Sequence, residues 1–516
     1  MWLYLETTMN LLSSTSVFSF YTLISRLLGY IRDILIAIFL GTSIYADAFF
    51  VAFRLPNTFR RLFAEGTFNA AFIPSYTSEK IITKKRGKKF ADEVLTLLIL
   101  ILFLIVLLVE IFAPYVVYLI APGFYLNNEK FNLAIELTRI TFPFLIFVSL
   151  SSFFSGILNS NNKFAAAAAA PIILNLILIL SLVISYLLNL NFAKNLSFGV
   201  FLSGVIQLIF LIYFTSKYYK PTIKFKIKIN NKVKFFLKKL LPSIFSSGVT
   251  QINILIGTII ASFEASAVSY LYYADRLYQI NLAIAGIAVG TVSLPILAKA
   301  INKKDILKTF NIQNKSIELS LLLSIPASLG LILASEEIVS ALFGYGSFSQ
   351  EDTILTAKAL KYFGYGIPAF AMLKVLSNFF FARDNTKTPF YISVCIVLLN
   401  VTISLSLFKT FGFIIIPIST SISTWLGILG YIYLLNKASY LNFNKPLLKN
   451  TFKIIISTIF MSLVLLFGIN YYVESLEYAY KFKAIYLLII VTLSAIIYLI
   501  TCYLTGVLKF KNYKIK

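Results

Sequence analysis

The sequence contains no histidine, only two cysteines and only 13% charged residues in 516 positions. The lack of histidine excludes a Ser-His-Asp triad, a histidine proton relay and a histidine metal ligand. Cys395 and Cys502 lie far apart in apolar stretches, which argues against a disulfide framework. A soluble protein of this length would carry roughly twice as much charge. These absences exclude histidine-dependent catalysis and point away from an aqueous environment.

What the sequence does contain is long apolar runs, with 59% hydrophobic residues overall. Each run holds the ~20 residues that a helix needs to cross the membrane, so we predict an all-α polytopic membrane protein with about 14 transmembrane helices. The predicted spans are 15–40, 44–72, 92–121, 132–158, 165–188, 196–216, 236–262, 267–297, 312–341, 354–382, 389–408, 411–436, 451–472 and 483–506.

The basic residues alternate with these spans. Strongly basic segments such as SEKIITKKRGKKFADE follow even-numbered spans, whereas the loops after odd-numbered spans are short or nearly neutral. By the positive-inside rule, this alternation predicts a multi-pass protein with both termini in the cytoplasm. The net charge of +25 therefore reflects topology, together with a codon bias toward lysine, and we expect no nucleic-acid partner.

An internal repeat accompanies the spans. Three pairs of residues recur at one offset of 225 positions, and they are Pro143 with Pro368, Phe154 with Phe379, and Asn175 with Asn400. An even number of spans per copy predicts two pseudo-symmetric six-helix lobes, an architecture suited to a transporter with a central cavity.

The repeat and the basic segments together divide the chain. We predict an N-terminal cytoplasmic segment (1–14), an N-lobe (15–216), a basic linker (217–235), a C-lobe (236–436), two additional helices (437–506) and a basic tail (507–516).

Charged residues inside the predicted spans are the main functional signal, because each costs about 2.5–3.5 kcal/mol on insertion scales. Arginine offers bidentate hydrogen bonds to phosphate, so Arg26, Arg32 and Arg276 predict an anionic substrate with phosphate or diphosphate. Further candidates for a polar cavity or gate are Asp33, Asp47, Arg54, Arg60, Arg61, Glu65, Asp275 and Lys374.

Structural alternatives exist for several of these residues. Arg54 and Glu65 could snorkel or pair, Arg61 and Glu65 are spaced as an i,i+4 ion pair, and Lys374 could be a structural counter-charge. Glu136 and Arg139 lie near the end of a span, which favours a role at the membrane interface over a role in a cavity.

At the segments SRLLGYIRD (25–33) and RLPNTFRRLFAEG (54–66), and also at YYADRLYQ and DNTKTP, the chain closely resembles the MurJ (MviN) family of lipid II flippases in the MOP transporter superfamily. The resemblance covers nearly the whole chain. It implies alternating access between two six-helix lobes, a lipid-tail groove formed by the last two helices, and diphosphate binding by Arg26, Arg32 and Arg276. It also implies lipid II as substrate and a place in the bacterial cytoplasmic (inner) membrane, among membrane lipids and cell-wall synthesis proteins.

Some members of the family resemble one another in a sodium site, and this sequence departs from them there. Gly257 and Ser404 stand where acidic residues would be expected, and Asn400 and Thr420 are the remaining candidate ligands. Because a hard cation prefers charged oxygens, we expect no cofactor and coupling to the membrane potential rather than to a tightly bound monovalent cation.

Two other functions share these features. A MOP-type exporter of drugs or of another lipid-linked oligosaccharide would have the same architecture. A membrane scaffold that recruits cell-wall synthases would use the charges structurally. We find no nucleotide-binding loop or catalytic constellation, so we expect that the protein is not an enzyme.

Overall fold

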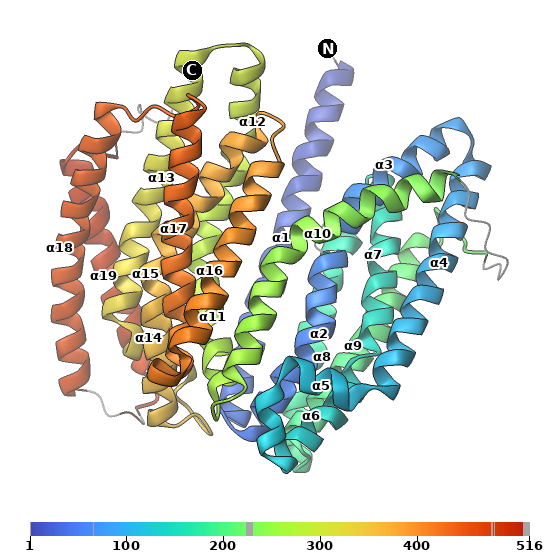
Figure 1. Ribbon diagram of the computed structural model, residues 1–516, viewed down its shortest axis with the longest axis horizontal. Helices are drawn as coiled ribbons and strands as arrows, with labels where there is room; N and C mark the ends of the chain where they lie inside the picture. Colours follow the sequence, from blue (N-terminus) through green and yellow to red (C-terminus); the bar gives the residue numbers. More distant parts are fainter. Residues whose placement is uncertain (1, 65–66, 223–230, 476–477, 479, 509–516) are drawn as a thin grey trace. The chain divides into compact units, whose positions relative to one another are not determined.

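The computed structural model describes residues 2–64, 67–222, 231–475, 478 and 480–508, and the chain forms two compact units, residues 1–266 and 267–516. Their secondary structure is helical throughout the described residues (Figure 1). Nine helical segments in this part of the chain are long and apolar enough to cross a membrane. The described residues of all fourteen predicted spans are largely helical, although some spans consist of two helices, so the predicted fold class is confirmed.

The first unit is built from long helices with shorter ones at their ends. Its elements are α1 (Trp2–Leu40), α2 (Ile44–Ala64), α3 (Thr67–Ile82), α4 (Lys84–Ile111), α5 (Ala113–Ile120), the 3₁₀ turn η1 (Pro122–Leu126), α6 (Asn128–Thr141), α7 (Phe144–Ser160), α8 (Phe164–Leu188), α9 (Phe192–Thr215) and α10 (Asn231–Ala261).

The predicted span 132–158 is interrupted in the structure. Pro143 has no backbone N–H, and α6 ends just before it, while α7 begins just after it. Similarly, the predicted span 92–121 consists of α4 and the short α5, with Pro114 in the first turn of α5. The turn between α3 and α4 lies at one end of this unit, and α5, η1 and α6 lie at the other (Figure 1).

Aromatic residues from four helices, α3, α4, α7 and α10, pack together in the core of the first unit. Phe236 of α10 meets Phe68, Phe72 and Phe90 edge-on, with ring centroids 5.8 to 6.3 Å apart. Phe153 of α7 packs on Phe72 at 5.0 Å. The beginning of α10 is therefore anchored in the first unit, although the predicted division placed the corresponding span in the second lobe. The division into six-helix lobes remains a prediction.

The second unit contains the remaining helices. Its elements are α11 (Ala267–Leu282), the π-helical segment η2 (Ala283–Ala288), α12 (Val289–Asn302), α13 (Ile306–Leu333), α14 (Ser335–Phe343), α15 (Gln350–Phe381), α16 (Lys387–Phe411), the 3₁₀ turn η3 (Gly412–Ile414), α17 (Ile415–Lys437), α18 (Lys445–Ser475) and α19 (Lys483–Leu504).

The last two helices form a hairpin at the edge of the second unit (Figure 1). α18 packs against α13, and α19 packs against α14. The hydroxyl of Tyr498 in α19 donates a hydrogen bond to the Leu322 carbonyl of α13 at 2.6 Å, which fixes the depth of the hairpin.

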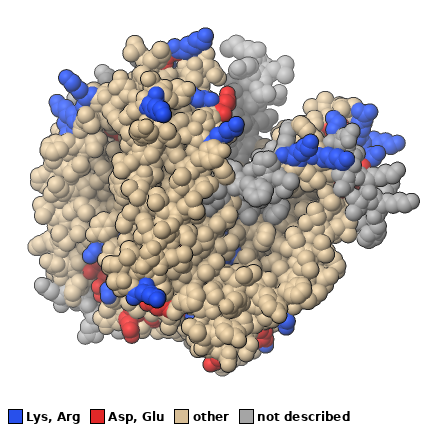
Figure 2. All heavy atoms as spheres, in the orientation of Figure 1, with Lys and Arg blue, Asp and Glu red and all other residues tan. Residues whose placement is uncertain are grey.

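Charged side chains lie mainly at the ends of the helices. On the face that Figure 2 shows, the sides of the helices are almost free of charge, and Lys and Arg gather at their ends. In the first unit, exposed basic residues crowd the start of α4, namely Lys84, Lys85, Arg86, Lys88 and Lys89. This arrangement is typical of a protein whose helix sides face hydrocarbon.

Candidate functional site

Arg32 is the most buried of the three predicted substrate-binding arginines, with 6% of its surface exposed. Its Nε and Nη2 donate to Oδ1 of Asp33 at 3.0 and 2.6 Å. Its Nη1 donates to Oδ1 of Asn175 in α8 at 2.9 Å. The carboxylate therefore compensates the guanidinium charge inside the first unit, and the amide fixes its direction.

Asn175 also ties the two helices together. Its Nδ2 donates to the backbone carbonyl of Ser25 in α1 at 2.8 Å, while its oxygen accepts from Arg32. One amide thus bridges two turns of α1. The sequence identified Asn175 through the repeat alone, and gave no indication that it contacts the arginine.

Arg26 lies in the same helix but is exposed. Six residues separate it from Arg32, which corresponds to a rotation of about 240° around an α-helix. The structure therefore does not bring these two arginines together on one side of α1. Arg26 is available to a ligand from outside the helix contact, whereas Arg32 is fixed within it.

Asp47 begins α2 and is fully buried. Its Oδ2 lies 2.5 Å from Nζ of Lys130 in α6, and this ammonium stands 4.1 Å from the ring centroid of Phe124. The position in the first turn of α2 also favours a carboxylate electrostatically. Sequence reasoning missed Lys130, and the signal that could have found it is an isolated lysine in an otherwise nearly neutral loop.

The other charged residues of α2 are half-buried. Arg60 donates from Nε to the side-chain oxygen of Asn57 at 3.0 Å, and Arg54 and Arg61 lie on the helix at similar exposure. The helix continues through Pro56. Glu65 falls outside the described residues.

In the second unit, Asp275 and Arg276 contact residues one helical turn away. Nη2 of Arg276 donates to the hydroxyl of Tyr272 at 3.0 Å, and the guanidinium carbon stands 4.8 Å from that ring. Asp275 accepts a short hydrogen bond from Gln279. Both contacts join residues four positions apart, so the helical spacing made them predictable. Arg276 is half-buried in α11.

Lys374 of α15 is exposed and lies where α15 meets α12. A Cβ added at Gly290 of α12 would stand 3.7 Å from the Lys374 carbonyl oxygen, and Nδ2 of Asn378 donates to the Gly290 carbonyl at 2.6 Å. The lysine therefore lies beside a close helix contact.

Asn400, a candidate cation ligand, belongs to a cluster of neutral side chains. Its Oδ1 accepts hydrogen bonds from Ser419 at 2.5 Å and from Thr420 at 3.4 Å. Ser404 stands 2.6 Å from the Ser419 hydroxyl. Gly257 lies in α10 of the first unit.

The side chains of this cluster carry no formal charge, and the Asn400 oxygen already accepts hydrogen bonds from the hydroxyl groups of Ser419 and Thr420. No group of three or more His, Cys, Asp or Glu residues that could hold a metal occurs among the described residues.

Comparisons with known proteins identify the family of this chain. The family model described as "Lipid II flippase MurJ" matches residues 36–488. The chain is 36% identical over 509 residues to a "Probable lipid II flippase MurJ" from Rickettsia prowazekii (strain Madrid E), covering 98% of this chain and 99% of the relative.

Two solved structures extend the comparison. One is titled "Lipid II flippase MurJ, inward closed conformation" and matches with a TM-score of 0.80 and 28% identity, covering 94% of this chain and 98% of that one. An inward-facing multidrug resistance MATE family transporter of the MOP superfamily matches with a TM-score of 0.66 and 15% identity, covering 81% and 95%, and this likeness concerns the fold alone. The chain therefore belongs to the MurJ family of lipid II flippases, which are multi-pass membrane transporters and not enzymes.

Proposed function

We propose that this protein moves lipid II, the undecaprenyl-diphosphate-linked disaccharide pentapeptide, from the cytoplasmic to the outer leaflet of the bacterial inner membrane. Family membership over most of the chain supports this substrate. The observation that carries the proposal is the buried guanidinium of Arg32 in a helix of a membrane protein. Such a charge is expensive in hydrocarbon and typically belongs to a substrate pathway.

The diphosphate is bound by Arg26, Arg32 and Arg276 in this proposal. Arg26 is exposed and offers a full set of N–H donors, which suits a first contact with phosphate. Arg32 is oriented by Asp33 and Asn175 and supplies a fixed positive edge. Tyr272 orients Arg276 by a hydrogen bond and by its ring.

Transport proceeds by alternating access of two lobes to the two sides of the membrane. The polar gate contains Asp33, Asp47, Arg54, Arg60, Arg61, Glu65, Asp275 and Lys374. The neutral cluster around Asn400 supports coupling to the membrane potential rather than to a bound monovalent cation. Moving one charge across the bilayer is worth about 2.3 kcal/mol per 100 mV.

The basic segments set the orientation, with both termini in the cytoplasm. The exposed lysines at the start of α4 support this assignment, because positively charged residues prefer the cytoplasmic side. The exposed apolar sides of α18 and α19, which include Phe467 and Leu488, are suited to contact the polyprenyl tail.

A replacement assay tests the proposal. The chain is expressed in a bacterium whose own lipid II flippase can be switched off, and outer-leaflet lipid II is measured by its cleavage with an externally added enzyme. The wild type should restore cleavable lipid II, and Arg26→Ala, Arg32→Ala and Arg276→Ala should each abolish it at equal membrane abundance. Arg86→Ala, in the exposed start of α4, is the matched control and should transport normally.

Two outcomes would contradict the proposal. Arginine variants that transport normally would remove the cationic site and favour a scaffold that recruits cell-wall synthases. A well-inserted wild type that leaves lipid II inside, and whose purified form binds other anionic lipids equally well, would favour an exporter of another substrate.

A further inference from the structure

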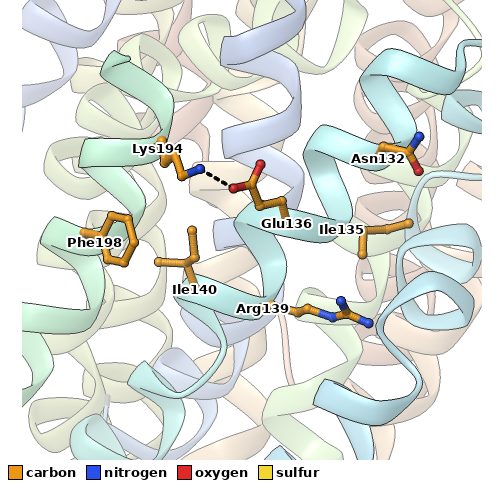
Figure 3. Close-up of a pocket in the computed structure, with 7 residues that line it drawn as sticks. All are labelled: Asn132, Ile135, Glu136, Arg139, Ile140, Lys194 and Phe198. Carbon is orange, nitrogen blue, oxygen red and sulfur yellow. Dashed lines mark ion pairs between the residues drawn. The ribbon is translucent and has the colours of Figure 1, made fainter. Parts of the chain in front are cut away.

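A hollow of about 560 Å³ opens on the first unit between α6 and α9. Seven residues line it, namely Asn132, Ile135, Glu136, Arg139, Ile140, Lys194 and Phe198 (Figure 3). Glu136 and Arg139 are the pair that the sequence assigned to a membrane interface. The transport proposal above uses none of these seven residues.

Helical spacing explains how these side chains come together. Asn132, Glu136 and Ile140 follow one another at steps of four in α6, and Lys194 and Phe198 are four apart in α9. Residues three or four apart share one face of a helix. Because α6 packs against α9, the two faces form a hollow with a polar part and an apolar part.

The position of the hollow along the helices corresponds to the headgroup region of a bilayer. The stretch from Glu136 to Ser160 runs through α6 and α7 and corresponds to about 36 Å of helix, and the stretch of α9 from Lys194 to Thr215 corresponds to about 32 Å, at 1.5 Å per residue. Lys163 and Lys217 follow just after those two helix ends. Since the hydrocarbon core is about 30 Å thick, the hollow lies at the interface opposite to these lysines.

The charges in and beside the hollow balance. Nζ of Lys194 reaches across from α9 to Oε1 of Glu136 at 2.5 Å, with half of each side chain exposed (Figure 3). Arg139 lies one turn further along α6 with its side chain pointing away from this pair (Figure 3), and it is within electrostatic reach of Glu110 at the end of α4. Two cations and two carboxylates therefore lie in or beside the hollow. An anion alone would meet as much repulsion as attraction, whereas a headgroup that carries both charges would find a partner for each.

Hydrogen-bonding capacity remains on both sides of this set. Arg139 has five N–H donors on an exposed side chain. Glu136 accepts from Lys194 at one oxygen, and a carboxylate has about four acceptor positions. The exposed ring of Phe198 and the half-buried Ile140 offer an apolar wall toward the hydrocarbon.

We propose that this hollow binds the phosphoethanolamine headgroup of a zwitterionic glycerophospholipid. Lys194 donates to the phosphate, the exposed side chain of Arg139 turns toward the same phosphate on binding, Glu136 accepts from the primary ammonium, and the acyl chains pass over Phe198 and Ile140. A choline headgroup has no N–H to donate, and a glycerol headgroup carries no positive charge. The site therefore selects ethanolamine over both.

Native mass spectrometry of the purified full-length chain tests this site. The detergent-solubilised protein is mixed with equal amounts of phosphatidylethanolamine, phosphatidylcholine and phosphatidylglycerol. The lipids that stay bound after the detergent is removed are then counted. The wild type should retain phosphatidylethanolamine over each competitor by about tenfold, the effect of one charge-assisted hydrogen bond. Arg139→Ala should reduce retention of phosphatidylethanolamine by a similar factor.

The Glu136→Gln variant tests the contact with the ammonium group separately from the contacts with the phosphate. It should still retain phospholipid through the phosphate, but it should lose the preference for ethanolamine over choline. Lys217→Ala, an exposed lysine just after the far end of α9, is the matched control and should bind as the wild type does. Equal or stronger retention of phosphatidylglycerol by the wild type, or an unchanged lipid preference in both Arg139→Ala and Glu136→Gln, would overturn the proposal. These readouts do not depend on lipid II transport.

Discussion

Two buried lysines, one in each unit, are held in different ways. Lys130 in the first unit pairs with the carboxylate of Asp47 at 2.5 Å. Lys483 in the second unit donates hydrogen bonds to the Ser340 hydroxyl and to the backbone carbonyls of Gly344 and Tyr478, at 2.7 to 3.0 Å. The comparison shows that a buried ammonium can be stabilised either by an opposite charge or by a set of dipoles that uses all three of its N–H donors.

The two arrangements share further parts. An aromatic ring stands 4.1 Å from each ammonium, Phe124 beside Lys130 and Tyr478 beside Lys483. A glycine also belongs to each arrangement. Gly123 donates its backbone N–H to Ser262 at the end of α10, and the Gly344 carbonyl accepts from Lys483. The main difference is the carboxylate, so removing single groups should separate the two cases.

The largest effect is expected for Asp47→Asn. It leaves the buried Lys130 without its counter-charge, and breaking such a pair costs about 3–5 kcal/mol. The free energy of unfolding in mixed micelles should fall by that amount. The double variant Asp47→Leu with Lys130→Met should recover most of the loss, because it removes both charges together. Equal stability of Asp47→Asn and the wild type would show that the pair is not coupled.

Lys483→Met should have the second largest effect. It leaves three acceptors without a donor but leaves no buried charge, so we expect a loss of about 2–3 kcal/mol. The same unfolding measurement applies. Lys481→Met, two residues earlier and exposed, is the control and should leave stability unchanged. A loss as large as that of Asp47→Asn would mean that the two lysines are held equally strongly.

Gly123→Ala should come third. A Cβ at this position would stand 2.2 Å from the Ser262 carbonyl oxygen, so the backbone of η1 must move away from α10. Overpacking of this kind costs about 1–3 kcal/mol, again measured as the free energy of unfolding. Gly330→Ala in α13 is the matched control because nothing lies within 4 Å of its added Cβ. It should be neutral or slightly stabilising.

Gly344→Ala should have the smallest effect. The added Cβ would meet the Ser340 carbonyl oxygen at 2.7 Å, the Tyr478 hydroxyl at 2.8 Å and the Lys483 ammonium at 3.0 Å. The Ser340 carbonyl must shift, but the other two atoms are the ends of side chains that can move, so we expect a loss of about 1 kcal/mol, near the lower limit for overpacking. Gly430→Ala in α17, with open space around its Cβ, serves as control. A larger loss than for Gly123→Ala would reverse the order of rigidity between the two sites.

Some parts of this fold could be predicted from the sequence, and others could not. Apolar runs and basic loops predicted a helix at every span, because hydrophobic length determines where a chain can cross a membrane. They did not predict that α6 and α7 would be separate, since a proline in the middle of a span could equally kink a continuous helix.

For the candidate site, contacts within one helix were predictable and contacts between helices were not. The pairing of Arg276 with Tyr272 follows from their spacing of four residues. The contacts of Arg32 with Asn175 and of Asp47 with Lys130 join residues more than eighty positions apart. Only packing determines such contacts, and one sequence contains no record of them.

The π-helical segment η2 lies inside the span that runs from Ala267 to Asn302. A wider turn of this kind holds one more residue than an α-helical turn, and each residue corresponds to about 100° of rotation. The segment therefore acts as an angular offset between α11, which carries Arg276, and α12, whose Gly290 accepts from Asn378. With one residue fewer in η2, the segment would still be long enough to span the membrane. Gly290 would, however, be rotated by about 100° around the helix axis, away from α15. The direction in which Arg276 points is thus set partly by a stretch of alanine, isoleucine and glycine that bears no charge at all.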